Sequence, residues 1–381
     1  CELRDNVRRI RHHACLCLWC GNNELEMQIG QNTWSTSVKQ RYDYIKLFEY
    51  AIPRLMRREC PDVFFWLSSP SSGGNFDDTC AEDRGDSHFW DVWHGGKPFA
   101  EYRKHYFRYL SEFGFQSLPC LQTVRSFAAP EDCNLFSRVM EMHQRNAGAN
   151  GKILGYLADY YLYPSNFEHL IYASQLLQAQ SIRYGIEHFR RHRGRCMGTL
   201  VWQLDDTWPG ASWSGIDYFG RRKALHFIEK RAFAPVMISC EEIGEMTERP
   251  SCVEEPHPIE KSIRLHVATE TRQAVHGMVH WELRDALSHV LQCRQYSVSI
   301  PPLAGLWLEK VCFPEADERG AYVRYGFDVA GRTLSEGTVL FTKPKHFRFA
   351  NPHLRCRVEG DCLYVAADAY AQFVQVEGGD E

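Results

Sequence analysis

The sequence predicts an α/β fold, the C-terminal part of a (β/α)8 TIM barrel, followed by an Ig-like antiparallel β-sandwich. In residues 1–237, short apolar runs alternate with amphipathic segments, as parallel strands joined by helices do. From Ser262 onward, apolar and polar residues alternate in short runs separated by turns, which is typical of a two-sheet sandwich. About five strand–helix units precede residue 237, whereas a closed barrel needs about eight. We therefore expect a fragment that lacks the first barrel strands.

The first segments predict a helix, a strand and two further helices. Residues 5–13 are typical of the end of a helix. The run ACLCLWC at residues 14–20 predicts a strand buried on both faces, because no polar residue interrupts it. A helix is expected over residues 40–50. Pro53 predicts the start of another helix through Arg58, since proline is tolerated in a first helical turn.

The middle of this part predicts two or three short strands. The run VFFWL at residues 63–67 predicts a strand, and a loop rich in Ser, Gly and Pro follows it. A short strand is expected near residues 88–93 and a helix near Tyr102. Residues 106–110 then lead into Ser111 and Glu112.

The longest helix is expected over residues 167–193. Ser165 and Glu168 fit a capping box at its start, and Gly194 fits its end. Two elements then complete this part: a strand over residues 198–204 (GTLVWQL) and a helix over residues 223–233.

The domain boundaries follow from changes in composition. Residues 1–237 form the expected partial barrel, and residues 238–350 the linker and the Ig-like sandwich. Residues 240–260 are rich in Pro and Glu and form the expected linker. Residues 351–381 are expected to be the start of a further, truncated β-sandwich domain.

Composition excludes several functional classes. With 44% hydrophobic and 13% aromatic residues, the chain can bury large cores. A net charge of −4 does not favour nucleic acid or an anionic membrane as partner, and no run of about 18 apolar residues suggests a membrane span. The 15 cysteines lack the paired spacings of a disulfide scaffold, which favours a cytoplasmic location.

Several acidic residues follow directly after apolar strands. Glu24 follows ACLCLWC through Gly-Asn-Asn, Glu112 follows the strand that ends at Leu110, and Asp205 follows VWQL. In a barrel, strand ends meet at the face where active sites are built. A single carboxylate at a strand end is more often a helix cap or a loop residue. Two such glutamates among Asn, Gly and aromatic neighbours make a catalytic pair a stronger hypothesis.

Five ordered blocks resemble the β-mannosidases of glycoside hydrolase family 2. The first, WCGNNE, resembles the acid/base motif of the family, and SEFGFQS resembles its nucleophile strand. The block LSSPSSGG is similar to the stretch after the fifth strand, GDSHFWDVWHG to the sixth-strand signature, and WQLDDTWP to the eighth strand. In sequence order, the blocks lie at residues 19–24, 67–74, 85–95, 111–117 and 202–209.

The resemblance implies a role for each site residue. Glu24 would be the general acid/base and Glu112 the nucleophile of a retaining mechanism, which needs no metal or organic cofactor. We expect an apolar site and the charge of Glu112 to raise the pKa of Glu24. The other residues would bind substrate: Asn23 at the 2-hydroxyl, Trp202 as a floor for the sugar, and Trp93, His94 and Asp205 around the site.

The implied activity is removal of terminal β-D-mannose residues from an oligosaccharide or glycoconjugate. Within the same family, β-galactosidase, β-glucuronidase and exo-glucosaminidase remain alternatives. A different class also remains open, in which the chain is an inactive fragment or a module that binds sugar without cleaving it. We expect low or no activity for the isolated chain, because missing strands would contribute walls of the pocket.

Other side-chain groups have simpler explanations. Cys15, Cys17 and Cys20 could ligate a metal, but no second cluster completes four ligands, and we expect core packing. His188 and His192 are four residues apart on a helix. The arginines around them predict a solvated basic helix end rather than a metal or nucleic-acid site.

Overall fold

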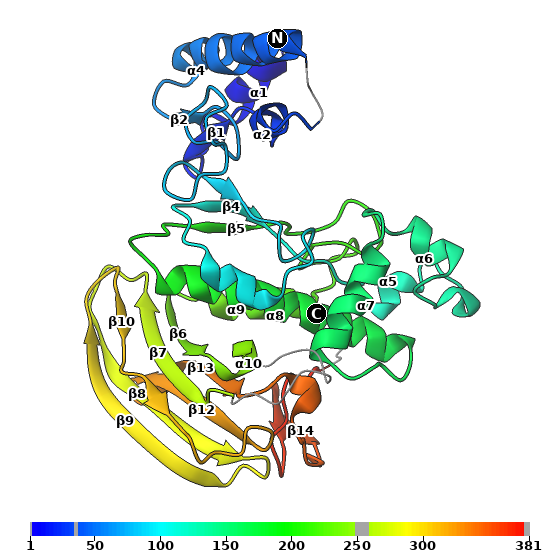
Figure 1. Cartoon of the computed structure of the whole chain (residues 1–381), viewed down its shortest axis with the longest axis vertical. Coiled ribbons are helices and arrows are strands. Elements are labelled where there is room, and N and C mark those ends of the chain that lie inside the picture. Colours follow the sequence, from blue (N-terminus) through cyan, green and yellow to red (C-terminus); the bar gives the residue numbers. More distant parts are fainter. Residues whose placement is uncertain (1, 34–36, 248–258, 377–381) are drawn as a thin grey trace. The chain divides into compact units, whose positions relative to one another are not determined.

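The computed structural model describes residues 2–33, 37–247 and 259–376 (Figure 1). The chain divides into two compact units. Unit 1 consists of Cys1–Gly114 and His192–Trp202, and unit 2 of Phe115–Arg191 and Gln203–Glu381. Within the described ranges, every helix is too short or too polar to cross a membrane.

Unit 1 begins with a parallel strand pair and its surrounding helices. Strand β1 (Leu18–Cys20) pairs with β2 (Phe64–Trp66), with Leu18 opposite Phe64. Val7 and Met56, on two of the helices, are buried in a common apolar cluster. The helices of this part are α1 (Glu2–Ile10), α2 (Leu25–Gly30), α3 (Val38–Tyr44), the π-helix η1 (Ile45–Ala51) and α4 (Ile52–Glu59).

The strand expected over residues 14–20 is shorter and more exposed than its apolar sequence predicts. Only Leu18–Cys20 are extended, and the Leu18 side chain is 44% exposed. An uninterrupted apolar run becomes buried on both faces only where other elements cover those faces. Among the described residues β1 pairs with β2 alone, so the expectation of a doubly buried strand is wrong here.

The two helices expected around Pro53 form one continuous helical run. Helices α3, η1 and α4 follow each other without a break, and Pro53 lies in the first turn of α4. Proline lacks the N–H that an α-helix would use at this point. The π-helical turn just before it changes the hydrogen-bond register, and the chain can therefore continue as a helix.

A second sheet of unit 1 contains three short parallel strands in the order β3-β4-β5. The central strand β4 (Leu110–Phe113) has both of its end residues fully buried. The register shifts between Ser87 and His88, and His88 thereby becomes the partner of Glu112. The neighbouring elements are β3 (Ser87–His88), the 3-10 helix η2 (Phe99–Lys104) and β5 (Thr199–Val201).

Unit 2 begins with helices, of which α8 (Phe167–Arg191) is the longest. The expected capping box of Ser165 and Glu168 is wrong by one position. The Asn166 side chain accepts a hydrogen bond of 2.8 Å from the backbone N–H of His169 instead, and asparagine caps a helix as well as serine does. The other elements are α5 (Leu121–Val124), η3 (Pro130–Asp132), α6 (Arg138–Met142), α7 (Ala149–Tyr160) and α9 (Ala224–Ala232).

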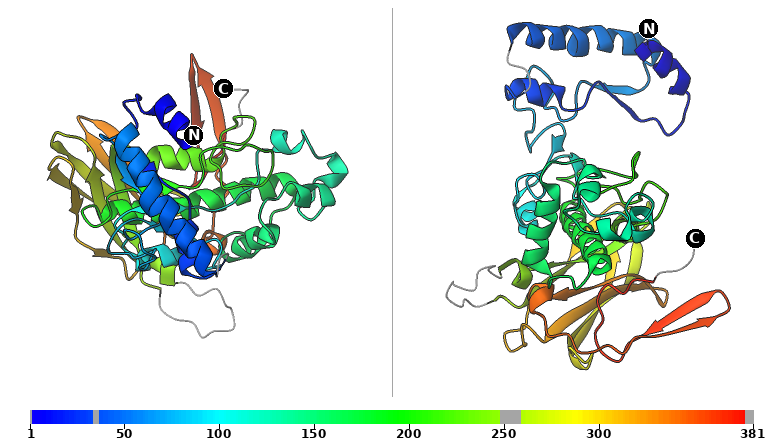
Figure 2. Two further views of the ribbon diagram at one scale, coloured as in Figure 1. Left: turned by 90° about the horizontal axis from the view of Figure 1, so that it is seen from above. Right: turned by 90° about the vertical axis from the view of Figure 1, so that its right-hand side faces the viewer.

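The remainder of unit 2 is an antiparallel β-sandwich. One sheet has the order β10-β7-β11, with β6 also paired to β7, and the other has the order β13-β12-β8-β9. Figures 1 and 2 show the two sheets facing each other. Their strands are β6 (Val236–Glu242), β7 (Ser262–Thr269), β8 (Val275–Asp285), β9 (Val290–Ile300), β10 (Gly305–Trp307), β11 (Val311–Cys312), β12 (Ala321–Val329) and β13 (Arg332–Leu340).

The sandwich core is built from the inward-facing residues of these strands. Trp281 is 2% exposed and packs edge-on against Phe313, with ring centroids 5.3 Å apart. Such a ring pair contributes dispersion and quadrupole attraction beyond simple burial. The alternating sequence expected to form an Ig-like sandwich therefore does so.

The sandwich begins earlier than the expected linker allows. Strand β6 pairs antiparallel with β7 along its whole length, so residues 240–242 of that linker belong to the sandwich. Two short helices, α10 (Gly244–Thr247) and η4 (Pro344–His346), lie near its ends in sequence. Residues 248–258 of the expected linker lie outside the described residues.

An antiparallel hairpin follows the sandwich. Strand β14 (Arg355–Glu359) pairs with β15 (Cys362–Ala366), and both strands are exposed along their length. Figure 2 shows this hairpin, in red, projecting from the sandwich. A further β-domain starting at residues 351–381 stays a prediction, and residues 377–381 lie outside the described part of the chain.

Gly21 follows β1 and lies close to the backbone of Leu67, which follows β2. A substitution at Gly21 tests whether this close contact is needed. A Cβ at this position would lie 2.2 Å from the Leu67 carbonyl oxygen, so Gly21→Ala must push the two strands apart. We expect the free energy of unfolding to fall by about 1–3 kcal/mol, the usual cost of overpacking. Denaturant unfolding followed by circular dichroism measures this change.

Gly30→Ala is the matched control in the same unit. A Cβ at Gly30 would have its nearest neighbour at 3.6 Å, which is an ordinary contact. We expect this variant to unfold at the same denaturant concentration as the wild type or slightly above it. Equal unfolding midpoints for the two alanine variants would show that the strands do not meet closely at Gly21.

Candidate active site

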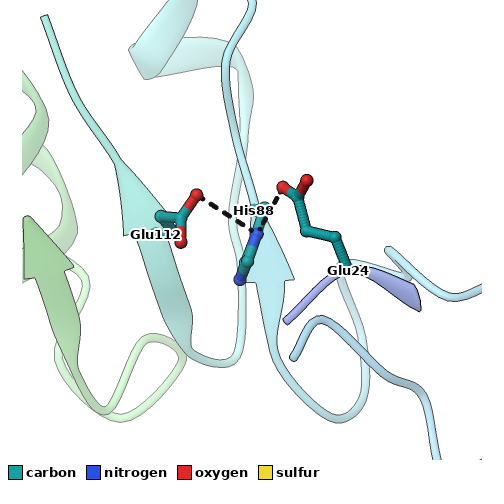
Figure 3. A group of neighbouring side chains, drawn as sticks. All are labelled: Glu24, His88 and Glu112. Atoms are coloured by element: carbon teal, nitrogen blue, oxygen red, sulfur yellow. Dashed lines mark hydrogen bonds and ion pairs between the residues drawn. The ribbon is translucent and has the colours of Figure 1, made fainter. Parts of the chain in front are cut away.

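Three polar side chains from separate elements of unit 1 meet at one point. Glu24 precedes α2, His88 ends β3, and Glu112 lies in β4. Figure 3 shows both carboxylates directed at the His88 ring. The Nδ1 atom of His88 lies 2.9 Å from Oε1 of Glu24 and 3.5 Å from Oε1 of Glu112. The sequence-predicted pair of glutamates is thus brought together, with a histidine between them.

The residues before Glu24 fix its place by backbone contacts with the stretch after β2. The N–H of Glu24 donates to the Ser69 carbonyl at 2.7 Å, and the N–H of Ser69 donates to the Asn22 carbonyl at 3.0 Å. The side-chain oxygen of Asn22 accepts a bond of 3.0 Å from the Leu25 N–H. Glu24 itself has φ 61°, a left-handed conformation. Left-handed backbone is uncommon for a residue other than glycine and is often found at functional sites. Here the hydrogen bonds with Ser69 hold it in place.

Glu112 is fixed by the central strand of its sheet. Its carbonyl accepts a bond of 2.9 Å from the Phe89 N–H, which continues the pairing of β3 with β4. Its carboxylate accepts a bond of 3.2 Å from the indole N–H of Trp90. A regular strand with buried neighbours gives Glu112 a more rigid base than a loop would.

Burial and hydrogen bonding move the pKa values of the two carboxyls in opposite directions. The hydrogen bond from His88 lowers the pKa of Glu24 below its ordinary value, although partial burial acts against it. Burial raises the pKa of Glu112, and the nearby charge of Glu24 adds to that effect. The expectation of a raised pKa for Glu24 is therefore wrong for the site as it stands, because it left out His88.

A buried carboxylate, Asp86, lies behind the histidine. Its side chain is 7% exposed and lies two residues before His88. One of its oxygens accepts bonds from the Trp66 indole at 2.7 Å and from the Ser71 N–H at 2.9 Å. The other accepts bonds of 2.6 Å each from the hydroxyls of Ser69 and Ser111. Four donors satisfy this buried charge, as burial requires.

Within the cluster, Glu24 and His88 are close enough to share a proton. The carboxylate oxygens and the His88 nitrogen lie within 4.8 Å of one another. A divalent cation could use the same spacing, but the contact of 2.9 Å between His88 and Glu24 has the length of a hydrogen bond. The three side chains are also only 2–20% exposed, so bulk water has little access to the cluster.

Two of the predicted substrate-binding residues lie beside the catalytic candidates. Asn23 is exposed and directly precedes Glu24, and its backbone forms a bridge with Ser69. His94 is exposed, and its ring centroid lies 5.0 Å from that of Trp90. The charge of His94 also contributes to the lowered pKa of Glu24.

The two predicted tryptophans differ in exposure. Trp202 directly follows β5 and is 44% exposed, and its N–H donates to the Phe113 carbonyl at 2.8 Å. Its ring is therefore available to a ligand. Trp93 is 0% exposed, so its ring is closed to solvent, and the expectation that it lines the site stays a prediction. Trp90, three residues earlier, contacts Glu112.

Asp205 belongs to unit 2 and is exposed. Its carbonyl accepts a bond of 2.9 Å from the Gln203 side chain. The next residue, Asp206, accepts bonds of 2.8 and 2.7 Å from the hydroxyls of Ser212 and Ser214. Asp206, rather than Asp205, is therefore the acid that organises this loop, and a substrate contact by Asp205 stays a prediction.

Sequence reasoning missed His88, Asp86, Trp90 and Ser69. All four lie within the blocks quoted for the family resemblance, LSSPSSGG and GDSHFWDVWHG. The spacing of Asp86, His88 and Trp90 could have indicated them. They are two residues apart in sequence, and alternate residues of an extended segment share a face. The register shift at His88, which brings the histidine to Glu112, has no signature in a single sequence.

The three N-terminal cysteines are more exposed than expected, and the C-terminal end of α8 is more buried than expected. Cys15, Cys17 and Cys20 are exposed free thiols and not core residues, because the strand that carries Cys20 is short and uncovered. His188 is 1% exposed and Arg191 3% exposed, so this end of α8 is not solvated as expected. Arg191 donates a hydrogen bond of 3.4 Å to the Cys240 carbonyl and lies 3.6 Å from a Glu187 carboxylate oxygen.

Comparison with known proteins finds similarity to proteins named β-mannosidase. Residues 261–346 match the family described as Mannosidase Ig/CBM-like domain. β-Mannosidase B of Emericella nidulans is 31% identical over 251 residues, which is 62% of this chain and 30% of that protein. β-Mannosidase B of Aspergillus fumigatus is 31% identical over 297 residues, 73% of this chain and 34% of that protein. The chain spans about a third of the length of the curated relatives it matches.

Solved structures show the same fold. The β-D-mannosidase from Dictyoglomus thermophilum matches with a TM-score of 0.84 and 24% identity, over 97% of this chain and 45% of that chain. The exo-chitosanase CsxA from Amycolatopsis orientalis matches with a TM-score of 0.64 and 12% identity, over 97% and 40% of the two chains.

The pKa of Glu24 tests its contact with His88. Because the His88 hydrogen bond is the largest cause that lowers this pKa, His88→Gln should make Glu24 titrate at higher pH than in the wild type. Carbon-13 NMR of the glutamate carboxyl groups measures the titration. His105→Gln is the matched control, since the His105 ring contacts a different carboxyl, Glu82, at 2.8 Å.

In the control, Glu24 should titrate as in the wild type. A Glu24 titration in His88→Gln that is unchanged or moves to lower pH would contradict the hydrogen bond as the cause.

Proposed function

From the relationship of this chain to β-mannosidases over most of its length, we propose that it carries the catalytic pair of a retaining exo-β-mannosidase. Glu24 acts as general acid/base and Glu112 as nucleophile. The substrate class is a terminal β-D-mannoside of an oligosaccharide or glycoconjugate. The support comes from the geometry of the two carboxyls, the motifs around them and the names of the relatives.

The separation of the carboxyls is the observation that carries the proposal. An oxygen of Glu24 and an oxygen of Glu112 lie within 4.8 Å of each other. Retaining glycosidases place their carboxyls about 5–5.5 Å apart, whereas inverting enzymes need roughly 6.5–9.5 Å to fit a water molecule between acid and sugar. The short separation therefore favours direct attack by a carboxylate.

We propose further that the parallel strands are the C-terminal part of a (β/α)8 barrel. The order of β3, β4 and β5 is that of neighbouring barrel strands, and all three run parallel. Glu24 and Glu112 then lie at the carboxyl ends of the strands, where barrel enzymes build their sites. The fold shared with the Dictyoglomus thermophilum β-D-mannosidase supports this assignment.

In the first step, the Glu112 carboxylate attacks the anomeric carbon while Glu24 protonates the glycosidic oxygen. The bond to the leaving group breaks, and an ester bond forms between the sugar and Glu112. The Trp90 indole N–H, 3.2 Å from the Glu112 carboxylate, orients the attacking group. Only one Glu112 oxygen is engaged by that bond.

In the second step, Glu24 accepts a proton from water, and the resulting hydroxide equivalent attacks the anomeric carbon. The ester to Glu112 breaks and the sugar leaves with its original configuration. The left-handed backbone at Glu24 directs its side chain toward His88 and the nucleophile. One carboxyl thus serves as acid and then as base.

Three neighbouring side chains complete the proposed site. Asn23 bonds the sugar 2-hydroxyl, a contact that strengthens in the oxocarbenium-like transition state. The half-exposed Trp202 ring offers an apolar face for the sugar, and the exposed His94 lies beside Trp90. These roles rest on the family resemblance and on the exposure of the side chains.

A sugar-binding module without catalysis is the competing class. The exposed ring of Trp202 would serve such a module equally well. A binding module has no use for two carboxylates within 4.8 Å, because their mutual repulsion must be offset. The paired glutamates therefore favour an enzyme.

The catalytic roles are tested with a 2-fluoro mannosyl fluoride. Its fluorine slows both steps, so the glycosyl–enzyme ester accumulates, and peptide mass spectrometry should find the sugar on Glu112. Glu24→Gln and Glu112→Gln should each lower kcat by about 10²–10⁴-fold or more, the usual contribution of such a group. Glu168→Gln, at an exposed position of α8, is the matched control and should retain full activity.

Labelling of Glu24 in place of Glu112 would reverse the two roles. Unchanged turnover in both glutamine variants would remove the assignment altogether.

Substrate specificity is tested with nitrophenyl glycosides. We expect the full-length protein to hydrolyse the β-mannoside, and to cleave the β-galactoside, β-glucuronide and β-glucosaminide at least about 100-fold more slowly, since unpaired polar groups in a site penalise the wrong sugar strongly. EDTA should leave the rate unchanged, because the proposed reaction uses only carboxyl and imidazole groups. Cleavage of the galactoside alone would exclude mannosidase activity.

A further inference from the structure

The hydrogen bonds behind His88 favour one tautomer of its ring. Nε2 of His88 lies 2.9 Å from the Ser69 hydroxyl, and that hydroxyl lies 2.6 Å from Asp86. Ser111 also donates to Asp86 at 2.6 Å, and its hydroxyl lies 3.2 Å from that of Ser69. All of these side chains belong to unit 1, and Asp86 and His88 are buried.

A hydroxyl group has one hydrogen to donate. If Ser69 donates to Asp86, it can only accept from His88, and Nε2 must then carry a hydrogen. The alternative is donation from Ser69 to Nε2, which would leave the buried Asp86 carboxylate with one donor fewer. The shorter contact, 2.6 Å to Asp86 against 2.9 Å to His88, is typical of a charge-assisted bond to the carboxylate.

We propose that Asp86 and Ser69 are positioning residues that fix His88 with a hydrogen on Nε2, so that Nδ1 shares one proton with Glu24. This inference rests on the proposed function for its catalytic consequence, but the tautomer itself does not. With Nε2 protonated, the Nδ1 lone pair would face two carboxylates if no proton lay between them. The site therefore retains a proton on the line between Nδ1 and Glu24.

The shared proton has two balanced positions. On Nδ1 it makes an imidazolium beside a Glu24 carboxylate, and on Glu24 it makes a carboxylic acid beside a neutral imidazole. Passage from one to the other breaks the N–H bond and forms the O–H bond, with no change in total charge. His88 thus stores the proton that Glu24 gives to the glycosidic oxygen.

Other titratable groups near this proton act in a consistent direction. The hydrogen bond from His88 lowers the pKa of Glu24. Burial raises the pKa of Cys80 to about 11, so that thiol stays neutral. Four charged or titratable groups among the described residues act on His88 or Glu24. They are Asp86, which directly precedes β3, Cys80 of the preceding loop, His94, and Glu112 of β4.

Removal of the relay should release the other tautomer. In Asp86→Asn, the new amide can donate a hydrogen bond to the Ser69 hydroxyl. That hydroxyl can then donate its own hydrogen bond to Nε2 of His88. The neutral ring would carry its hydrogen on Nδ1 and donate it to the Glu24 carboxylate. Ser69→Ala removes the acceptor of the Nε2–H bond and should have the same effect.

Nitrogen-15 NMR of the histidine rings reads the tautomer without any need for turnover. In the wild type, the His88 signals, assigned by their loss in His88→Gln, should show hydrogen on Nε2 from neutral to mildly alkaline pH. Ser69→Ala and Asp86→Asn should shift the population to hydrogen on Nδ1. Ser111→Ala is the matched control, since it also removes one donor to Asp86 but does not contact His88, and it should keep the wild-type tautomer.

The pH dependence of kcat/KM tests the catalytic consequence. Ser69→Ala and Asp86→Asn should move the alkaline limb to lower pH by about one unit, which is about a tenfold loss of rate above that limb. A merely structural role would lower the rate equally at all pH values. Hydrogen on Nδ1 of neutral His88 in the wild type, or in Ser111→Ala and Ser69→Ala alike, would overturn the proposal.

The two arms separate this inference from the proposed function. Absence of mannoside hydrolysis by the full-length wild type would end the proposed function, while the NMR result would still decide the tautomer. An unmoved alkaline limb in variants whose tautomer has changed would overturn the role of His88 as a proton store.

Discussion

The approach of two carboxylates to one imidazole nitrogen is the constraint on which the site depends. The carboxylate oxygens lie within 4.8 Å of each other, and at that upper limit and an effective dielectric constant of about 20, two full negative charges repel by roughly 3–4 kcal/mol. The repulsion falls if one carboxyl is protonated or if a positive group lies between them. His88 lies between them, and the opposite pKa directions of Glu24 and Glu112 follow from its closer contact with Glu24.

The surrounding backbone is arranged to keep that contact. The register shift between β3 and β4 brings His88 beside Glu112, and the paired backbone bonds of Ser69 with Asn22 and Glu24 bring the second carboxyl to the same ring. Ser69 also links the ring to Asp86. Ser69, in the stretch after β2, thus positions both the backbone of Glu24 and the side chain of His88.

Sequence patterns could predict the order of the elements and the proximity of the two glutamates, because the ends of neighbouring parallel strands lie at the same edge of the fold. They could not predict burial where it depends on neighbours. The run ACLCLWC is apolar throughout, yet Leu18 is 44% exposed, and Trp93 is fully buried while Trp90 reaches the carboxylate. They also could not predict the pKa of Glu24, because the deciding group, His88, lies 64 residues away and arrives through a register shift.

The same contact explains how one carboxyl can change roles in the proposed reaction. When Glu112 becomes an ester, it loses its charge, and the imidazolium form of His88 loses one of its two stabilising partners. Loss of that charge also removes the repulsion that favoured a proton near Glu24. Both changes make it easier for the Glu24–His88 pair to exist with one proton fewer, which is the state that takes a proton from water. The alternation between acid and base therefore follows from the charge of Glu112 alone, with no movement of the backbone required.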